Sequence, residues 1–187
     1  SGLDKRGILI GNEATIFGTN FERSYLTQKH EKYLEKVSSL KPGEKANLGN
    51  IKIHALKTKH SAENAIGFKI ITNKIIVTYT GDTSYFPELK DEYLDSNILI
   101  ANCVKPFNVK DNNNLNSDDV VKLANEVKPQ LLIITHFGKQ LINEDPMFEA
   151  REIQRLTKIR TIAPKEGFVL DPGSFSDKIK QKSLNYY

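Results

Sequence analysis

The sequence lacks most features that mark secreted or membrane proteins. It has a single cysteine, Cys103, so no disulfide can form within the chain and no oxidising compartment is indicated. No apolar run approaches the roughly 18 to 20 residues that span a bilayer. The first residues also lack the basic stretch followed by an apolar one that marks secretory signals. We expect a cytoplasmic protein without a membrane anchor, in which Cys103 is a buried packing residue rather than a reactive thiol.

Strong charge of one sign is also missing. The 27 Lys and Arg residues exceed the 23 Asp and Glu residues by only four, and this excess is spread along the chain. Such a small, dispersed excess is typical of a solvated surface, and it favours an anionic partner only weakly. A length of 187 residues with 39% apolar content suits one domain with a real core, over residues 1–187, with a loosely held polar tail over 171–187.

Short apolar runs bounded by turn residues alternate with amphipathic segments. Strands are predicted over 7–11, 14–18, 51–57, 65–71, 74–80, 96–101, 130–134, 161–164 and 167–170, the first two forming a hairpin or edge pair. Helices are predicted over 27–40, over 87–94, from a cap at Ser117 to Pro129, and over 147–156. This order fits an α/β layered domain and fits neither a helix bundle nor a β-sandwich.

Three of the apolar strands end in a polar turn that contains a histidine or an aspartate. The turns are Thr58–Ser61 with His60, Tyr79–Thr83 with Asp82, and Thr135–Gly138 with His136. Imidazole nitrogens and carboxylate oxygens are ligands of zinc-like divalent ions, and strand ends on a rigid sheet present such groups well. His60, Asp82 and His136 are therefore candidate metal ligands. Ordinary polar residues in strand-end turns are the alternative.

These three turns, in this order and each after a strand, resemble the last three metal-binding motifs of the metallo-β-lactamase fold superfamily. The Gly81-Asp82-Thr83 form and the Thr135-His136-Phe137 ending are most similar to its phosphodiesterase-like branch, which includes the tRNA 3′-processing endonucleases and many uncharacterised hydrolases. The resemblance covers residues 7–170 and implies an α/β fold that is the C-terminal portion of an αββα sandwich.

The resemblance also implies a site and a reaction. His60 would bind a first metal ion, His136 a second, and Asp82 would bridge the two as the central catalytic residue. Two ions of zinc or another divalent transition metal lower the pKa of a bridging water and clamp an anionic substrate, which suits hydrolysis of a phosphodiester or small ester. The substrate would be an anionic small molecule or a nucleic acid. The same metal pair also serves thioester and lactone hydrolases.

The family signature His-x-His-x-Asp-His, which supplies four further ligands, occurs nowhere in this sequence. The chain also begins at Ser1 without an initiator methionine. We therefore expect the C-terminal part of a longer hydrolase, which pairs with its missing N-terminal half or with a second copy, because half a sandwich would expose an apolar face. The isolated chain is expected to bind metal weakly and to be inactive.

Two further residues are candidates for substrate contact. Phosphodiesterase relatives commonly carry a histidine just before the helix at Ser117, where this sequence has Asn114, which cannot donate a proton as an imidazolium does. His30 is the other candidate, although a lone histidine is more typical of a surface position. A second class of function also stays open, in which the chain is a non-catalytic binding or assembly module that has kept the ligands as structural residues.

Overall fold

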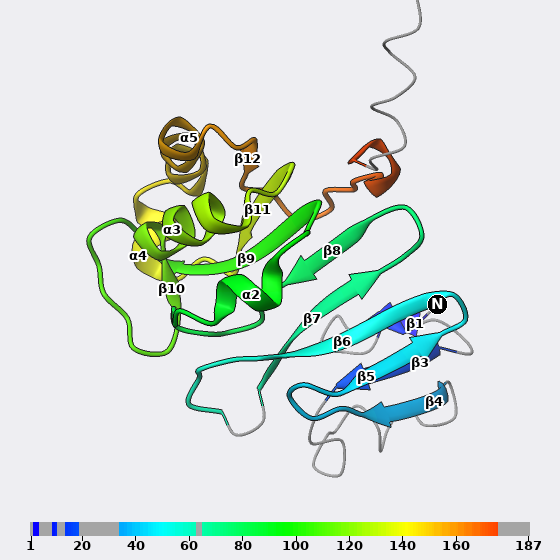
Figure 1. The fold of residues 1–187 in the computed structure, drawn as a ribbon. Helices are drawn as coiled ribbons and strands as arrows, with labels where there is room; N and C mark the ends of the chain where they lie inside the picture. The colour runs from blue at the N-terminus through cyan, green and yellow to red at the C-terminus, as the bar shows by residue number, and fades with distance from the viewer. Residues whose placement is uncertain (1, 4–8, 11–13, 19–33, 63–64, 176–187) are drawn as a thin grey trace, which may run out of the picture.

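The computed structural model describes residues 2–3, 9–10, 14–18, 34–62 and 65–175, and side chains from Ser39 onward within these ranges. Its larger sheet has eight strands in the order β12-β11-β9-β8-β7-β6-β5, with β10 beside β9 (Figure 1). The strands are β5 (Lys45–Leu48), β6 (Ile51–Lys57), β7 (Ile66–Ile71), β8 (Ile76–Tyr79), β9 (Ile98–Lys105), β10 (Leu115–Asn116), β11 (Leu131–Thr135) and β12 (Thr161–Ile162).

The sheet changes character at β8. Strands β5 to β8 are joined by antiparallel pairing, and the predicted pairing of 65–71 with 74–80 around Thr72 and Asn73 is confirmed. From β8 to β12 the pairing is parallel. Parallel strands need crossover connections, and helices α2 (Leu89–Tyr93), α3 (Ser117–Val127), α4 (Lys139–Asn143) and α5 (Pro146–Thr157) lie along these connections. The predicted α/β fold class is confirmed.

The helices gather on one face of the parallel part of the sheet (Figure 1). Alternate residues of β9 and β11 turn to opposite faces because side chains in a strand repeat every two residues. Leu99, Ala101 and Leu132 pack among the helices, whereas Ile98 and Leu131 pack on the opposite face. Both faces of these strands are therefore apolar, as the sequence of 96–101 predicts for a buried parallel strand.

Two short sheets precede the larger one, and here two predictions are wrong. Strand β2 (Leu9–Ile10) pairs with β1 (Gly2–Leu3), and β3 (Ala14–Gly18) pairs in parallel with β4 (Leu34–Ser39), so 7–11 and 14–18 do not form one pair. The helix predicted over 27–40 is a strand over its described part. In so short a segment a three-residue spacing of apolar side chains suits either state, and pairing with β3 decides it.

Two smaller predictions also need correction. Asn116, rather than Ser117, caps α3: its Oδ1 accepts from the Asp119 backbone N–H at 2.8 Å, and the Asp119 carboxylate accepts from the Asn116 N–H at 3.3 Å. Residues 167–170 do not form a strand. Gly167 lies in a turn with φ of +83°, and Leu170 packs instead against the face that carries Ile98.

The C-terminal segment includes the short 3₁₀ helix η3 (Pro172–Phe175), and the remainder of the predicted tail, 176–187, lies outside the described residues. Within the part of the chain that the structure describes, no helix combines the length and the apolar character that a membrane crossing requires.

A buried polar cluster joins α3 to α5. The Ser117 hydroxyl donates a hydrogen bond to the Glu149 carboxylate, and the Cys103 Sγ lies 3.6 Å from the Ser117 Oγ. Cys103 is fully buried, as expected, and burial raises the pKa of its thiol to about 12. Burial also raises the pKa of Glu149. Hydrogen bonds from Ser117 and from the Phe107 backbone lower this pKa, but the effect of burial is larger.

This raised pKa predicts a pH dependence of folding. Above the ordinary value of 4.5 the unfolded chain releases the Glu149 proton while the folded chain retains it, so stability falls as pH rises towards the folded-state pKa. Glu149→Gln keeps the shape and removes the titration. Urea unfolding of both proteins between pH 4 and 8 is expected to show this decline in the wild type, with a shallower decline in the variant. Parallel profiles would contradict the prediction.

Candidate metal centre

Asp82 is delivered by the loop after β8. The preceding Gly81 has φ of +64°, and a Cβ atom there would lie 2.6 Å from the Ile66 carbonyl oxygen, so only glycine lets the loop press against β7. The Thr80 hydroxyl accepts from the Asn102 backbone N–H at 3.0 Å and donates to the Gly81 carbonyl at 2.8 Å. The position of Asp82 is thus fixed by both neighbouring strands.

His136 follows β11 directly. Its backbone adopts the left-handed conformation, with φ of +61°, which is unfavourable for a residue with a Cβ atom. Two residues later, the Gly138 N–H donates to the Val104 carbonyl at 3.0 Å, and a Cβ at Gly138 would lie 2.5 Å from that oxygen. This close contact with the end of β9 holds the loop in place.

The structure brings two of the predicted residues, Asp82 and His136, close to each other. The His136 Nε2 lies 3.4 Å from the Asp82 Oδ1, with the two side chains 57% and 35% exposed. The two residues follow strands that flank β9 in a parallel sheet, so both lie at the same edge. A carboxylate and an imidazole that face each other and remain open on one side suit a divalent transition metal.

Asn102, near the end of β9, belongs to this site and was missed in the sequence. Its Nδ2 donates to the Asp82 Oδ1 at 2.7 Å and to the Tyr79 hydroxyl at 2.9 Å, and the residue is 2% exposed. Its Oδ1 is buried and has no hydrogen-bond partner among the described residues. A polar residue late in an apolar strand, between two strands that carry predicted ligands, was the available signal.

His60 lies in a loop that is tied to the Asp82 loop. The Lys59 N–H donates to the Thr83 hydroxyl at 2.9 Å, and the Lys59 carbonyl accepts from the Ser84 N–H at 2.8 Å. The His60 Nδ1 accepts from the Ala62 N–H at 3.1 Å, so in the neutral ring Nε2 carries the proton. Metal binding by this ring would require it to give up that hydrogen bond or that proton.

The predicted set is therefore brought together in part. No group of three or more His, Cys, Asp or Glu side chains arranged to hold a metal ion occurs within 39–62 and 65–175. Of the two candidates for substrate contact, Asn114 closes its own loop by donating from Nδ2 to the Asp111 Oδ1 at 3.2 Å. His30 lies outside the described residues.

The family of the chain is shown by comparison with known proteins. A family model described as the beta-lactamase superfamily domain matches residues 12–137, which is more than half of the chain. The chain therefore belongs to this superfamily, which confirms the resemblance found in the three turns. An uncharacterized protein of Methanocaldococcus jannaschii is 34% identical over 169 residues, which are 89% of this chain and 63% of that protein. The chain thus spans less than two thirds of this relative.

Solved structures agree on the fold. The metallo-beta-lactamase fold protein YhfI from Bacillus subtilis matches with a TM-score of 0.70 and 21% identity, over 84% of this chain and 65% of YhfI. A diphosphatase from the PhnP family matches with a TM-score of 0.61 and 15% identity, over 84% of this chain and 58% of that protein. Others of the same fold are named as metal-dependent hydrolases, a description they carry as putative or possible.

The left-handed backbone at His136 predicts a difference between two variants. Glycine adopts φ of +61° without the Cβ penalty and alanine does not. His136→Gly is therefore expected to unfold with a free energy about 1 kcal/mol higher than His136→Ala. Urea denaturation measures this difference, with the same pair of substitutions at the exposed Lys139, in α4, as a control for helix and surface effects. Equal stability of the two His136 variants would contradict the strain.

Proposed function

We propose that this chain supplies part of the active site of a metal-dependent hydrolase that cleaves a phosphodiester or small ester. The observation that carries the proposal is the facing pair of Asp82 and His136 at the edge of the parallel strands. Two divalent ions, zinc or another transition metal, would provide hydroxide near neutral pH and neutralise an anionic substrate. Asp82 and His136 would hold these ions together with His60.

The side chains around Asp82 have distinct tasks in this proposal. Asn102 donates to one carboxylate oxygen and so fixes the rotation of the group, which a bridging ligand requires. Tyr79, bonded to the same amide, fixes Asn102 in turn. Because Asn102 is buried, water cannot replace it at this oxygen. The carboxylate would then meet a metal ion without a rotational entropy cost.

The remaining ligands would come from outside the described pair. His60 is one source, after its ring turns away from Ala62. The other would be the part of the longer protein that this chain does not span, or a second copy of the chain, which would cover the open side of Asp82 and His136. The isolated chain would then bind metal weakly.

A cytoplasmic location, expected from the lone cysteine, also stays a proposal.

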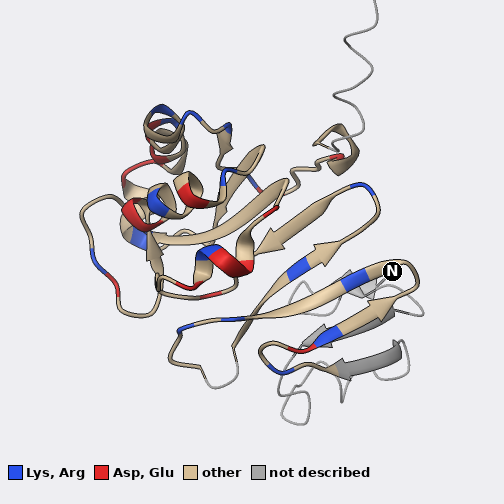
Figure 2. Ribbon diagram, in the orientation of Figure 1, with Lys and Arg blue, Asp and Glu red and all other residues tan. Residues whose placement is uncertain are grey.

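A phosphate-containing substrate is favoured over a neutral ester. Lysines adjoin two of the three loops of the site in the sequence: Lys59 precedes His60, and Lys139 follows Gly138. Lys105, at the end of β9, donates from Nζ to the Gln140 Oε1 at 3.0 Å, which adds a third cation at the end of this strand. Lys and Arg are otherwise interspersed with Asp and Glu along the chain (Figure 2). One solved structure of the same fold is a diphosphatase. Clustered cations would stabilise the charge of a phosphodiester more than that of a thioester or lactone.

Metal content tests the proposal. Elemental analysis after dialysis is expected to find zinc or another divalent transition metal in the longer protein, and little in Asp82→Asn or His136→Ala, with unchanged circular dichroism. Hydrolysis of bis(p-nitrophenyl) phosphate should fall in parallel, by at least about a hundredfold. Lys74→Ala, in the turn between β7 and β8, is the control. A completed protein that binds no metal would favour the non-catalytic binding or assembly module.

Asn102 allows a separate test of how Asp82 is oriented. Asn102→Leu removes the donor to Asp82 while keeping the volume, so metal affinity is expected to fall about 10- to 100-fold. Asn102→Gln keeps the amide but moves it by one methylene and should also bind metal more weakly. Titration with zinc against a chelating dye measures both. Wild-type affinity in Asn102→Leu would show that Asp82 needs no such support.

A further inference from the structure

A cavity of about 780 Å³ opens beside His136. Its walls come from the loop after β11, the turn between α4 and α5, and the segment 163–166 that follows β12. Its volume lies within the range of about 300 to 1,000 Å³ that is usual for small-molecule sites. The cavity therefore lies next to the bond that the proposed site would cleave.

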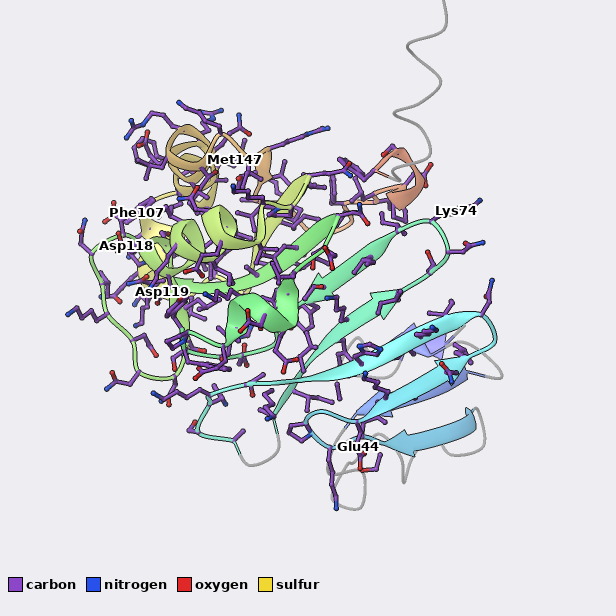
Figure 3. The ribbon with its side chains drawn as sticks, in the orientation of Figure 1. Glu44, Lys74, Phe107, Asp118, Asp119 and Met147 are labelled. Carbon is purple, nitrogen blue, oxygen red and sulfur yellow. The ribbon has the colours of Figure 1, made fainter. Side chains whose placement is uncertain are left out.

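The cavity has one apolar wall, and Asp145, Lys165 and Glu166 are among its other lining residues. Ile142 and Met147 contribute to its lining and are 57% and 44% exposed, which is unfavourable for large apolar side chains unless a partner covers them. Met147 lies at the start of α5 (Figure 3). Phe137, the neighbour of His136, and Pro164 complete the apolar wall. An apolar group of a substrate would find here the contact that the protein itself does not provide.

The wall is fixed before any ligand arrives. Asp145 adopts a left-handed backbone with φ of +68°, and its Oδ1 accepts from the Met147 N–H at 2.9 Å. Pro146 stands at the first position of α5, where its fixed φ suits the helix. Together with the left-handed His136 on the other side of α4, this cap fixes the direction in which Ile142 and Met147 face the cavity.

A second cavity, of about 670 Å³, shares Met147 and residues 163–166 with the first, including the acidic Glu166, and extends to Arg151 and Arg160. Both arginines also line a neighbouring hollow of about 480 Å³, whose other lining residues are Gln154, Arg155 and Lys158. Basic residues therefore outnumber acidic ones where Arg151 and Arg160 line the second cavity and the neighbouring hollow. An anionic group would be stabilised there.

We infer that the substrate carries an extended apolar group, which lies over Ile142 and Met147, and ends in a second anionic group held by Arg151 and Arg160. This inference rests on the proposed function, since it takes the anionic ester to be at Asp82 and His136. The apolar group would increase binding affinity because its apolar surface would be buried in the cavity, starting next to His136. The arginines would select ligands with charge at both ends over those with charge at one.

Met147 is the only methionine of these 187 residues, so the ¹³C-methyl methionine signal that Met147→Leu removes from the longer protein reports on the cavity. Butylphosphonate, octylphosphonate and an octane carrying phosphonates at both ends serve as non-hydrolysable probes, titrated into the longer protein. Octylphosphonate is expected to shift the Met147 signal with an affinity at least about tenfold higher than butylphosphonate, because four more methylenes are buried. The bisphosphonate should bind tighter still, by about threefold to tenfold.

Matched variants separate the two parts of the inference. Ile142→Asp should abolish the dependence on chain length, whereas Leu156→Asp, at an exposed residue of α5 that does not line the cavity, should keep it. Arg160→Gln should remove the advantage of the bisphosphonate, and Lys74→Gln, which removes an exposed cation that lines none of these cavities, should retain it. Equal affinities for butyl- and octylphosphonate, or an unmoved Met147 signal, would overturn the inference.

The outcome is separable from that of the proposed function. A protein that binds metal and hydrolyses phosphodiesters without a response at Met147 would overturn only the substrate inference. A response at Met147 in a protein that binds no metal would overturn the proposed function and leave the cavity as a ligand site.

Discussion

The parallel pairing of β8, β9 and β11 is the constraint on which the candidate site depends. The register places Tyr79 opposite Ile100 and Thr135 opposite Asn102, so the three strands end at one edge of the sheet. Asp82, Asn102 and His136 meet there although 54 residues of chain separate the first from the last. A one-residue shift of β9 would turn Asn102 to the other face and leave Asp82 without its donor.

The same edge concentrates features that cost stability. His136 adopts a left-handed backbone, Asn102 keeps a buried oxygen without a partner among the described residues, and Gly81 permits an approach that no other residue allows. Unfavourable backbone and unpaired polar atoms persist where the surrounding packing holds them, and they gather at functional sites. Here that packing comes from the apolar faces of β9 and β11, which are buried on both sides.

The strands of the central sheet can be predicted from the sequence, but the pairing of the N-terminal strands cannot. Runs such as 96–101 and 130–134 are too apolar to lie anywhere but inside a sheet, and the polar turns after 51–57, 74–80 and 130–134 indicate where the site lies. The few apolar residues of β4 suit either period, so its sequence alone predicts a helix, and only pairing with β3 decides for a strand. Asn102 was overlooked because a single amide within an apolar strand has no spacing pattern, and its role depends on a contact across 20 residues.

The open side of the site indicates where its remaining parts must lie. Asp82 and His136 are supported from below by β9, through Asn102 and through the contact of Gly138 with Val104, so no further ligand can approach from the sheet. Both side chains are partly exposed, and the cavity lined by Met147 opens beside His136. In the proposed hydrolase, additional metal ligands and the substrate would therefore share this exposed approach. In the proposed hydrolase, the covering segment would take the side towards His60, whose loop is tied to that of Asp82, and the substrate the side towards α5.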